Sequence, residues 1–194
     1  MKKIRVPYGM SVHDNKEIQA VIKTLKQSTQ MNQNVNRFEK KISQLFNKKY
    51  GLMVNSGSSA LLLAFASINL PKGSEVITPV LTFATTVSSM IHNNLIPVFV
   101  DVKQTTYCID EQKIEKMISK KTKAICIPNL IGNIPNWSIL RRIAKKHKLI
   151  IIEDSADALG SKFNNQSTGS YSDISVTSFY GSHIINCAGN GGMV

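Results

Sequence analysis

The chain has 194 residues, enough for one large domain with a buried core, and its 42% hydrophobic and 19% charged residues exclude a disordered chain. Its longest apolar runs, such as Leu61–Ala66, are far shorter than the roughly 20 residues of a membrane span. The net charge of +12 comes from lysines scattered through amphipathic segments without interleaved aromatic residues. This pattern favours solvated helix faces, then a phosphate-rich substrate, over nucleic acid. We therefore expect no membrane span and no nucleic-acid partner.

Neither the chain start nor the cysteines indicate secretion. The basic segment Met1–Arg5 is not followed by the apolar stretch of a signal peptide. Cys108, Cys126 and Cys187 are odd in number and widely spaced, which fits neither a disulfide framework nor a zinc site. We expect a cytoplasmic protein with three reduced thiols.

Helical patterns and short apolar runs alternate along the chain. Helices are predicted at Asn15–Gln27, Val35–Phe46, Ala60–Ile68, Thr85–His92 and Trp137–His147. Strands are predicted at Leu52–Val54, Glu75–Thr78, Ile96–Val100, Ala124–Ile127, Leu149–Glu153 and Ile174–Thr177. Because the strands are almost continuously apolar, they indicate a mostly parallel sheet covered by helices on both faces. The predicted class is α/β, a doubly wound three-layer αβα fold.

The first candidate for a ligand site is Asn55–Leu61, where a strand turns through Gly57 into a helix. The first N–H groups of a helix have no partners within it and bind anions well. Ser58 and Ser59 add hydroxyl groups. The alternative is a plain serine cap at the start of the helix.

The second candidate is Ile150–Asp157, where three apolar residues precede paired carboxylates. Asp154 falls at the carboxyl end of a predicted central strand, where open α/β sheets bind ligands. A buried carboxylate there needs a cationic partner or becomes neutral. A protonated pyridine nitrogen, a metal ion or an arginine could supply the charge, and no cluster of metal ligands accompanies it. The alternative is an aspartate that caps a helix.

The third candidate is Ser178–His183 with the small residues Ala188–Gly192. His183 lies among small, flexible residues after a predicted strand, where a ligand can approach closely. A lone histidine is more often structural, so His183 by itself decides nothing.

Seven motifs in the same order resemble the DegT/DnrJ/StrS-type family of sugar-nucleotide aminotransferases, which are fold-type I pyridoxal phosphate enzymes. They are Val35–Glu39 (family V-x-x-F-E), Asn55–Leu61 (N-S-G-T-x-A-L), Glu75–Pro79 (E-V-I-x-P), Thr82–Thr85 (T-F-x-A-T), Pro97–Val102 (P-V-F-x-D-V), Glu153–Gly160 and Ser178-Phe179. Each motif alone is weak, and their order makes the resemblance specific.

The resemblance implies a site for pyridoxal 5'-phosphate or pyridoxamine 5'-phosphate. Its implied residues are Gly57, Ser58, Ser59 and Ser178 at the phosphate, Phe83 stacked on the ring, Asp154 at the ring nitrogen and Asp157 near the ring hydroxyl. Asp154 would keep the ring protonated, so that the cofactor can accept electrons.

His183 stands where the aminotransferases carry their Schiff-base lysine in S-F-x-x-x-K, and no lysine follows Phe163. Imidazole has no primary amine and cannot form a Schiff base, but it can act as a base near neutral pH. This exchange resembles the branch of 4-keto-6-deoxyhexose 3-dehydratases, which hold pyridoxamine phosphate non-covalently. There the histidine removes a proton and the C3 hydroxyl leaves. The cysteine spacing predicts no iron–sulfur cluster, and no metal site is expected.

The resemblance therefore implies C3 dehydration of a nucleotide-linked 4-keto-6-deoxyhexose, with His183 as the catalytic base, in O-antigen, other surface polysaccharide or deoxysugar biosynthesis. Sugar transamination is the alternative reaction, and a non-catalytic paralogue or binding scaffold is the alternative class. The family implies a homodimer. We expect an N-terminal helical segment (1–34), a cofactor-binding large domain (35–194) that is incomplete at its C-terminal end, and no small C-terminal domain.

Overall fold

The computed structural model describes residues 4, 6 and 12–194, and in this part of the chain seven strands form one sheet in the order β1-β9-β8-β5-β4-β2-β3. The strands are β1 Met53–Val54, β2 Glu75–Pro79, β3 Ile96–Val100, β4 Thr122–Pro128, β5 Ile150–Asp154, β8 Ile174–Ser178 and β9 Gly192–Met193. Strands β8, β5, β4, β2 and β3 are parallel, and β9 is antiparallel to both β1 and β8. The predicted, mostly parallel α/β class is confirmed.

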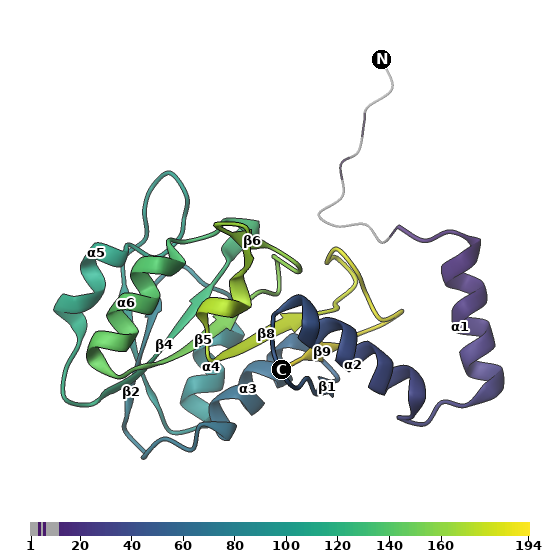
Figure 1. Ribbon diagram of the computed structural model, residues 1–194, viewed down its shortest axis with the longest axis horizontal. Coiled ribbons are helices and arrows are strands. Elements are labelled where there is room, and N and C mark those ends of the chain that lie inside the picture. Colours follow the sequence, from purple (N-terminus) through teal and green to yellow (C-terminus); the bar gives the residue numbers. More distant parts are fainter. Residues whose placement is uncertain (1–3, 5, 7–11) are drawn as a thin grey trace.

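Helices cover both faces of the sheet (Figure 1). They are α1 Asn15–Gln27, α2 Gln33–Leu45, α3 Gly57–Ser67, α4 Ala84–His92, α5 Glu111–Ile114 and α6 Trp137–His147, with the 3-10 turns η1 Glu115–Met117, η2 Leu130–Gly132 and η3 Thr168–Tyr171. A small hairpin, β6 Lys162–Phe163 and β7 Gln166–Ser167, precedes β8. Within the described residues, no helix is both long and apolar enough to span a membrane.

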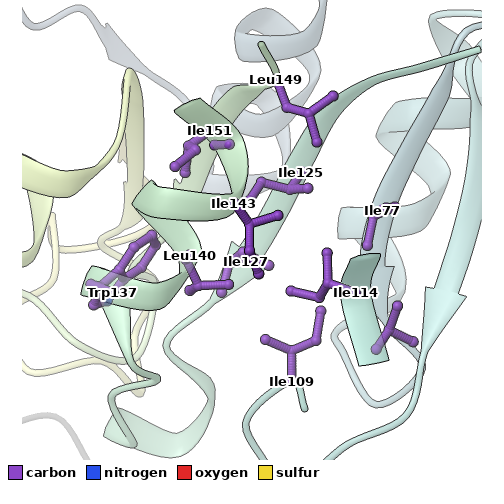
Figure 2. Close-up of a cluster of buried hydrophobic side chains, with 12 residues drawn as sticks. Ile77, Ile109, Ile114, Ile125, Ile127, Trp137, Leu140, Ile143, Leu149 and Ile151 are labelled. Atoms are coloured by element: carbon purple, nitrogen blue, oxygen red, sulfur yellow. The ribbon is translucent and has the colours of Figure 1, made fainter. Parts of the chain in front are cut away.

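Alternation along each strand divides the core into two layers. On one face Ile77, Ile125 and Ile151 pack with Trp137 and Leu140 of α6 (Figure 2). The opposite layer uses the strand neighbours Val76, Ala124, Cys126, Ile152 and Val176, which pack against α3 and α4. Because both sides of the central strands are buried, the strands are apolar at nearly every position.

The first two helices differ in how they meet this core. Ile42 of α2 and Phe46, the residue that caps its C-terminal end, pack against Phe179 and against Met193 of β9. Helix α1 stands apart from the sheet and has no buried residue (Figure 1), although Asp14 and Glu17 form a capping box that fixes its start. Among the described residues, packing against the core therefore begins with α2.

Candidate active site

A cavity of about 610 Å³ lies at the carboxyl ends of the parallel strands. Its walls come from the segments that follow β1, β2, β4, β5 and β8, which are distant in sequence. Seven of the eight predicted site residues line it: Gly57, Ser58, Phe83, Asp154, Asp157, Ser178 and His183. The fold therefore gathers side chains from five strand ends into one site.

Ser59 is the predicted residue that does not line this cavity. Its N–H donates to Ser56 Oγ at 3.1 Å, and its hydroxyl accepts from the same Ser56 Oγ at 3.1 Å. Ser56 is thus the N-cap of α3. The serine cap is confirmed, and Gly57 and Ser58 line the cavity at the start of the helix, so the prediction of an anion site there stays open.

Gly57 is set directly against Ser178 at this end of the cavity. A Cβ atom added at Gly57 would lie 2.7 Å from Ser178 Cβ, closer than carbon atoms approach in folded proteins. The close packing joins the N-terminus of α3 to the end of β8. Two hydroxyls, from Ser58 and Ser178, and the helix N-terminus form an arrangement that suits a phosphate group.

Gly57→Ala is expected to destabilise the chain by about 1–3 kcal/mol, because the new methyl group must push α3 away from β8. The displacement should also weaken binding of pyridoxamine phosphate more than binding of unphosphorylated pyridoxamine. Titration of both ligands by fluorescence measures this selectivity. Gly189→Ala is the matched control, because a Cβ there meets no atom within 4 Å. Equal losses for the two ligands would contradict a phosphate site at Gly57.

Asp154 is a buried carboxylate in the cavity wall without a charged partner. Thr86 Oγ1 donates to its Oδ2 at 3.2 Å and the Ala156 N–H donates to its Oδ1 at 3.2 Å. Burial is the largest cause of the rise in the pKa of Asp154 to about 6. The two hydrogen bonds oppose this rise, and the nearby Asp157 and Glu153 carboxylates contribute to it. No Lys, Arg or His of the described residues forms an ion pair with it. Such a group favours a bound cation.

The segment after β2 forms the wall beside Asp154. Phe83 is 68% exposed, lines the cavity and begins α4, whose Thr86 N–H donates to the Phe83 carbonyl at 3.0 Å. One turn of helix therefore holds both the Phe83 ring and the hydroxyl that contacts Asp154. Thr82 also lines the cavity, and its buried Oγ1 has no hydrogen-bond partner among the described residues.

His183 and Asp157 lie together on the wall formed by β5 and β8. His183 Nδ1 is 3.6 Å from Asp157 Oδ1, and the His183 and Tyr180 rings meet edge to face with their centroids 6.2 Å apart. The second carboxylate oxygen, Oδ2, accepts the Ile131 N–H at 3.0 Å. The Asp157 carboxylate thus contacts the Ile131 N–H through one oxygen and faces Nδ1 of the imidazole with the other.

Among the cavity residues that were not predicted from the sequence are Thr82, Asn129 and Ile131. Ile131 adopts φ 57° and ψ 26°, a left-handed conformation that is strained for a β-branched residue. Asn129 directly follows the buried strand β4, and this polar residue at a strand end was the available signal. Nothing in the sequence marks Ile131, because its strained conformation depends on the contact with Asp157.

The cavity holds groups whose chemistry suits a phosphorylated pyridine cofactor. The helix start at Gly57 and Ser58 with Ser178 suits the phosphate, Phe83 offers a ring face, and the unpaired Asp154 suits a protonated ring nitrogen. Among the described residues, no three His, Cys, Asp or Glu side chains are grouped as metal ligands. The fold and these contacts define a protein of the pyridoxal phosphate fold-type I class.

Comparison with known proteins identifies the family within this class. Residues 11–194 match the DegT/DnrJ/EryC1/StrS aminotransferase family, so the chain belongs to that family. It is 46% identical over 165 residues to the lipopolysaccharide biosynthesis protein RfbH of Salmonella typhimurium, covering 81% of this chain and 38% of that protein. It is 35% identical to the dTDP-4-dehydro-2,6-dideoxy-D-glucose 3-dehydratase of Saccharopolyspora spinosa, over 97% of this chain and 42% of that protein.

Solved structures agree with the fold. The E. coli GDP-4-keto-6-deoxy-D-mannose-3-dehydratase with bound hydrated PLP superposes with a TM-score of 0.92 at 31% identity. The match covers 98% of this chain and 51% of that one. The chain spans about half the length of this structure and less than half that of the two relatives.

Proposed function

We propose that the chain is the cofactor-binding part of an enzyme that uses pyridoxal or pyridoxamine 5'-phosphate to remove the C3 hydroxyl of a nucleotide-linked 4-keto-6-deoxyhexose. The observation that carries this proposal is His183, which lines the same cavity as Asp154 and has Asp157 beside it. Two kinds of support converge on the cavity. Its residues suit the cofactor, and relatives named as 3-dehydratases match nearly the whole chain.

The bound cofactor would supply an electron sink through its protonated pyridine ring. Asp154 would keep the ring nitrogen protonated, because a cation at that nitrogen stabilises the buried Asp154 carboxylate. Gly57, Ser58 and Ser178 would hold the phosphate, and Phe83 would stack on the ring. These non-covalent contacts would retain the cofactor without a Schiff-base lysine.

In the proposed reaction His183 is the base. It accepts a proton, and the removal of this proton starts the loss of the C3 hydroxyl. Asp157 Oδ1 lies 3.6 Å from Nδ1 and would orient the imidazole, so that Nε2 is the nitrogen that takes the proton. The same protonated nitrogen can return the proton to the departing hydroxyl as water. General acid–base help of this kind typically contributes about 100- to 10,000-fold to a rate.

Sugar transamination is the second candidate, favoured by membership of a family named for aminotransferases. It requires an amine to release the product from the cofactor. In the described part of the chain, the residues that line the cavity include no lysine. A scaffold without turnover is the third candidate, and it predicts no bound cofactor.

A product assay separates the three candidates. The protein, made at the full length that its gene encodes, is incubated with pyridoxamine phosphate and a nucleotide-linked 4-keto-6-deoxyhexose, and the sugar is analysed by mass spectrometry. Loss of the C3 oxygen without added nitrogen is expected. A stable amino sugar supports transamination instead, and an unchanged sugar with no cofactor absorbance supports the scaffold. Borohydride reduction is expected to leave the cofactor unattached to the protein.

The same proposal includes a homodimer, a cytoplasmic location and a role in lipopolysaccharide or deoxysugar biosynthesis. Exposed apolar residues at and near the cavity rim, Leu81, Phe83 and Ile131, suit a surface that a second subunit covers. The three free cysteines fit a reducing compartment.

We also propose that residues 35–194 form the cofactor-binding domain and that residues 1–34 form a separate helical segment.

A further inference from the structure

Glu153 is a fully buried carboxylate that the proposed chemistry does not use. It precedes Asp154 on β5, so the two side chains point to opposite faces of the sheet. Asp154 faces the cavity, whereas Glu153 faces the layer of α6 and η3. Burying a carboxylate costs several kcal/mol unless hydrogen bonds and a counter-charge stabilise it.

Four side chains donate hydrogen bonds to the Glu153 carboxylate. Oε1 accepts from Asn129 Nδ2 at 3.0 Å and from Ser155 Oγ at 2.7 Å. Oε2 accepts from Ser172 Oγ at 3.1 Å and from Ser175 Oγ at 2.7 Å. The donors come from the end of β4, the residue after β5, the segment after η3 and strand β8. One carboxylate therefore joins three neighbouring parallel strands.

The counter-charge is Lys48, which reaches the same cluster from the loop after α2. Its Nζ donates to the carbonyls of Gly169 at 2.8 Å and Ser172 at 2.6 Å and to Ser172 Oγ at 3.2 Å. Ser172 thus stands between the ammonium group and Glu153. Burial lowers the pKa of Lys48, and the charge of Glu153 opposes that effect.

The hydrogen-bond network around Glu153 extends to the cavity through Asn129. Its Oδ1 accepts from Trp137 Nε1 at 3.1 Å, and its backbone N–H donates to the Asp154 carbonyl at 2.8 Å. Asn129 itself lines the cavity. Its position therefore fixes this part of the cavity wall and also the end of β5, which carries Asp154. Strand β8 likewise runs from Ser175, which is bonded to Glu153, to Ser178 in the cavity.

We propose that Glu153 is a positioning residue, which holds the ends of β4, β5 and β8 together so that Asp154 and Ser178 meet the ring nitrogen and the phosphate of one bound cofactor. The inference rests on the proposed function, because it concerns the geometry of that same cofactor site. A buried network whose donors are all used fixes one arrangement of the chain. Loss of the carboxylate leaves Asn129 and three hydroxyls without their acceptor and releases the strand ends from one another.

Glu153→Ala, Glu153→Gln and Glu111→Ala test this role. Glu111 is the matched control, since it is also a buried carboxylate, bound to Lys103 and to the Asn136 N–H at 2.8 Å, and does not line the cavity. Pyridoxamine phosphate is titrated into each variant, and circular dichroism in the absorption band of the bound ring reports the orientation of the ring. Glu153→Ala should weaken binding by about tenfold or more and change the induced signal.

Glu153→Gln should recover most of the affinity and the signal, because the hydroxyls of Ser172 and Ser175 can rotate to accept from the amide. Glu111→Ala should lose stability but keep wild-type affinity and signal. If Glu153→Ala does not fold, the pair Ser172→Ala and Ser175→Ala removes both donors to Oε2 and should change the same signal. Wild-type binding and signal in a folded Glu153→Ala chain or in the folded double serine variant, or an equal loss in Glu111→Ala, would overturn the inference. Failure of the unaltered chain to bind the cofactor would instead overturn the proposed function and this inference together.

Discussion

Asp154→Asn is expected to make the cofactor-free chain more stable above pH 6 and, at the same time, to remove most of its affinity for the cofactor. Burial raises the pKa of this carboxyl from 3.8 to about 6. The folded chain therefore binds the proton more tightly than the unfolded chain. The stabilisation that this bound proton gives to the folded chain is fully present below pH 4. It is lost as the pH rises through about 6. At neutral pH, a rise of about two in the pKa lowers the free energy of unfolding by about 3 kcal/mol.

The substitution removes this cost because asparagine has nearly the same shape and carries no charge. Its Oδ1 can still accept from the Ala156 N–H, and its Nδ2 can donate to Thr86 Oγ1. Urea denaturation at pH 4 and pH 8 measures the effect. The variant should exceed the wild type at pH 8 and equal it at pH 4. Asp101→Asn is the control, since Lys113 lowers the pKa of the exposed Asp101, so this variant should lose a little stability at pH 8.

Cofactor binding should change in the opposite direction. In the wild type a protonated ring nitrogen stabilises the Asp154 carboxylate, and the neutral amide cannot replace that interaction. Removing one member of a buried charge pair costs about 2–5 kcal/mol, so we expect about 100-fold weaker binding of pyridoxamine phosphate. Stability gained together with unchanged affinity would show that Asp154 is buried for another reason. The opposed effects would identify a residue whose folding cost is tied to its function.

The sequence was sufficient to predict the parts of the fold that depend on local pattern. Apolar residues at helical spacing predicted α1 and α6 with the observed bounds, and the run Ile150–Ile152 predicted the centre of the sheet. The strand-end rule placed Asp154, Asp157 and His183 in one cavity. These predictions succeeded because a strand that is buried on both faces of a parallel sheet is apolar at nearly every position, which can be seen in the sequence.

Features that depend on close approach between distant segments could not be predicted. Ser59 was expected at the phosphate, but whether Ser56 or the ligand takes its N–H depends on the turn before α3. Strand β9 pairs antiparallel with β8, and its Gly192 passes so close to Ser56 that no Cβ would fit. The Asp157 contact with the strained Ile131 is likewise a result of tertiary packing.

His183→Lys is expected to change the chemistry of the site as well as its rate. A lysine amine at the end of β8 would be the first primary amine among the described residues that line the cavity. Borohydride should then attach pyridoxal phosphate covalently to the variant, whereas the wild type releases it on denaturation. Dehydration should fall by about 100-fold or more, because the imidazole base is gone. Mass spectrometry of the reduced protein and analysis of the sugar product measure the two effects.

His183→Asn separates the loss of the base from the gain of the amine. The asparagine amide can still donate to Asp157 Oδ1 in place of Nδ1, but it cannot accept a proton at neutral pH. This variant should bind pyridoxamine phosphate with near wild-type affinity, lose dehydration to the same extent and show no covalent attachment. If either variant dehydrated the sugar at the wild-type rate, His183 would have no part in proton transfer. Covalent trapping in the wild type would mean that another amine reaches the cofactor, and transamination would then become the better proposal.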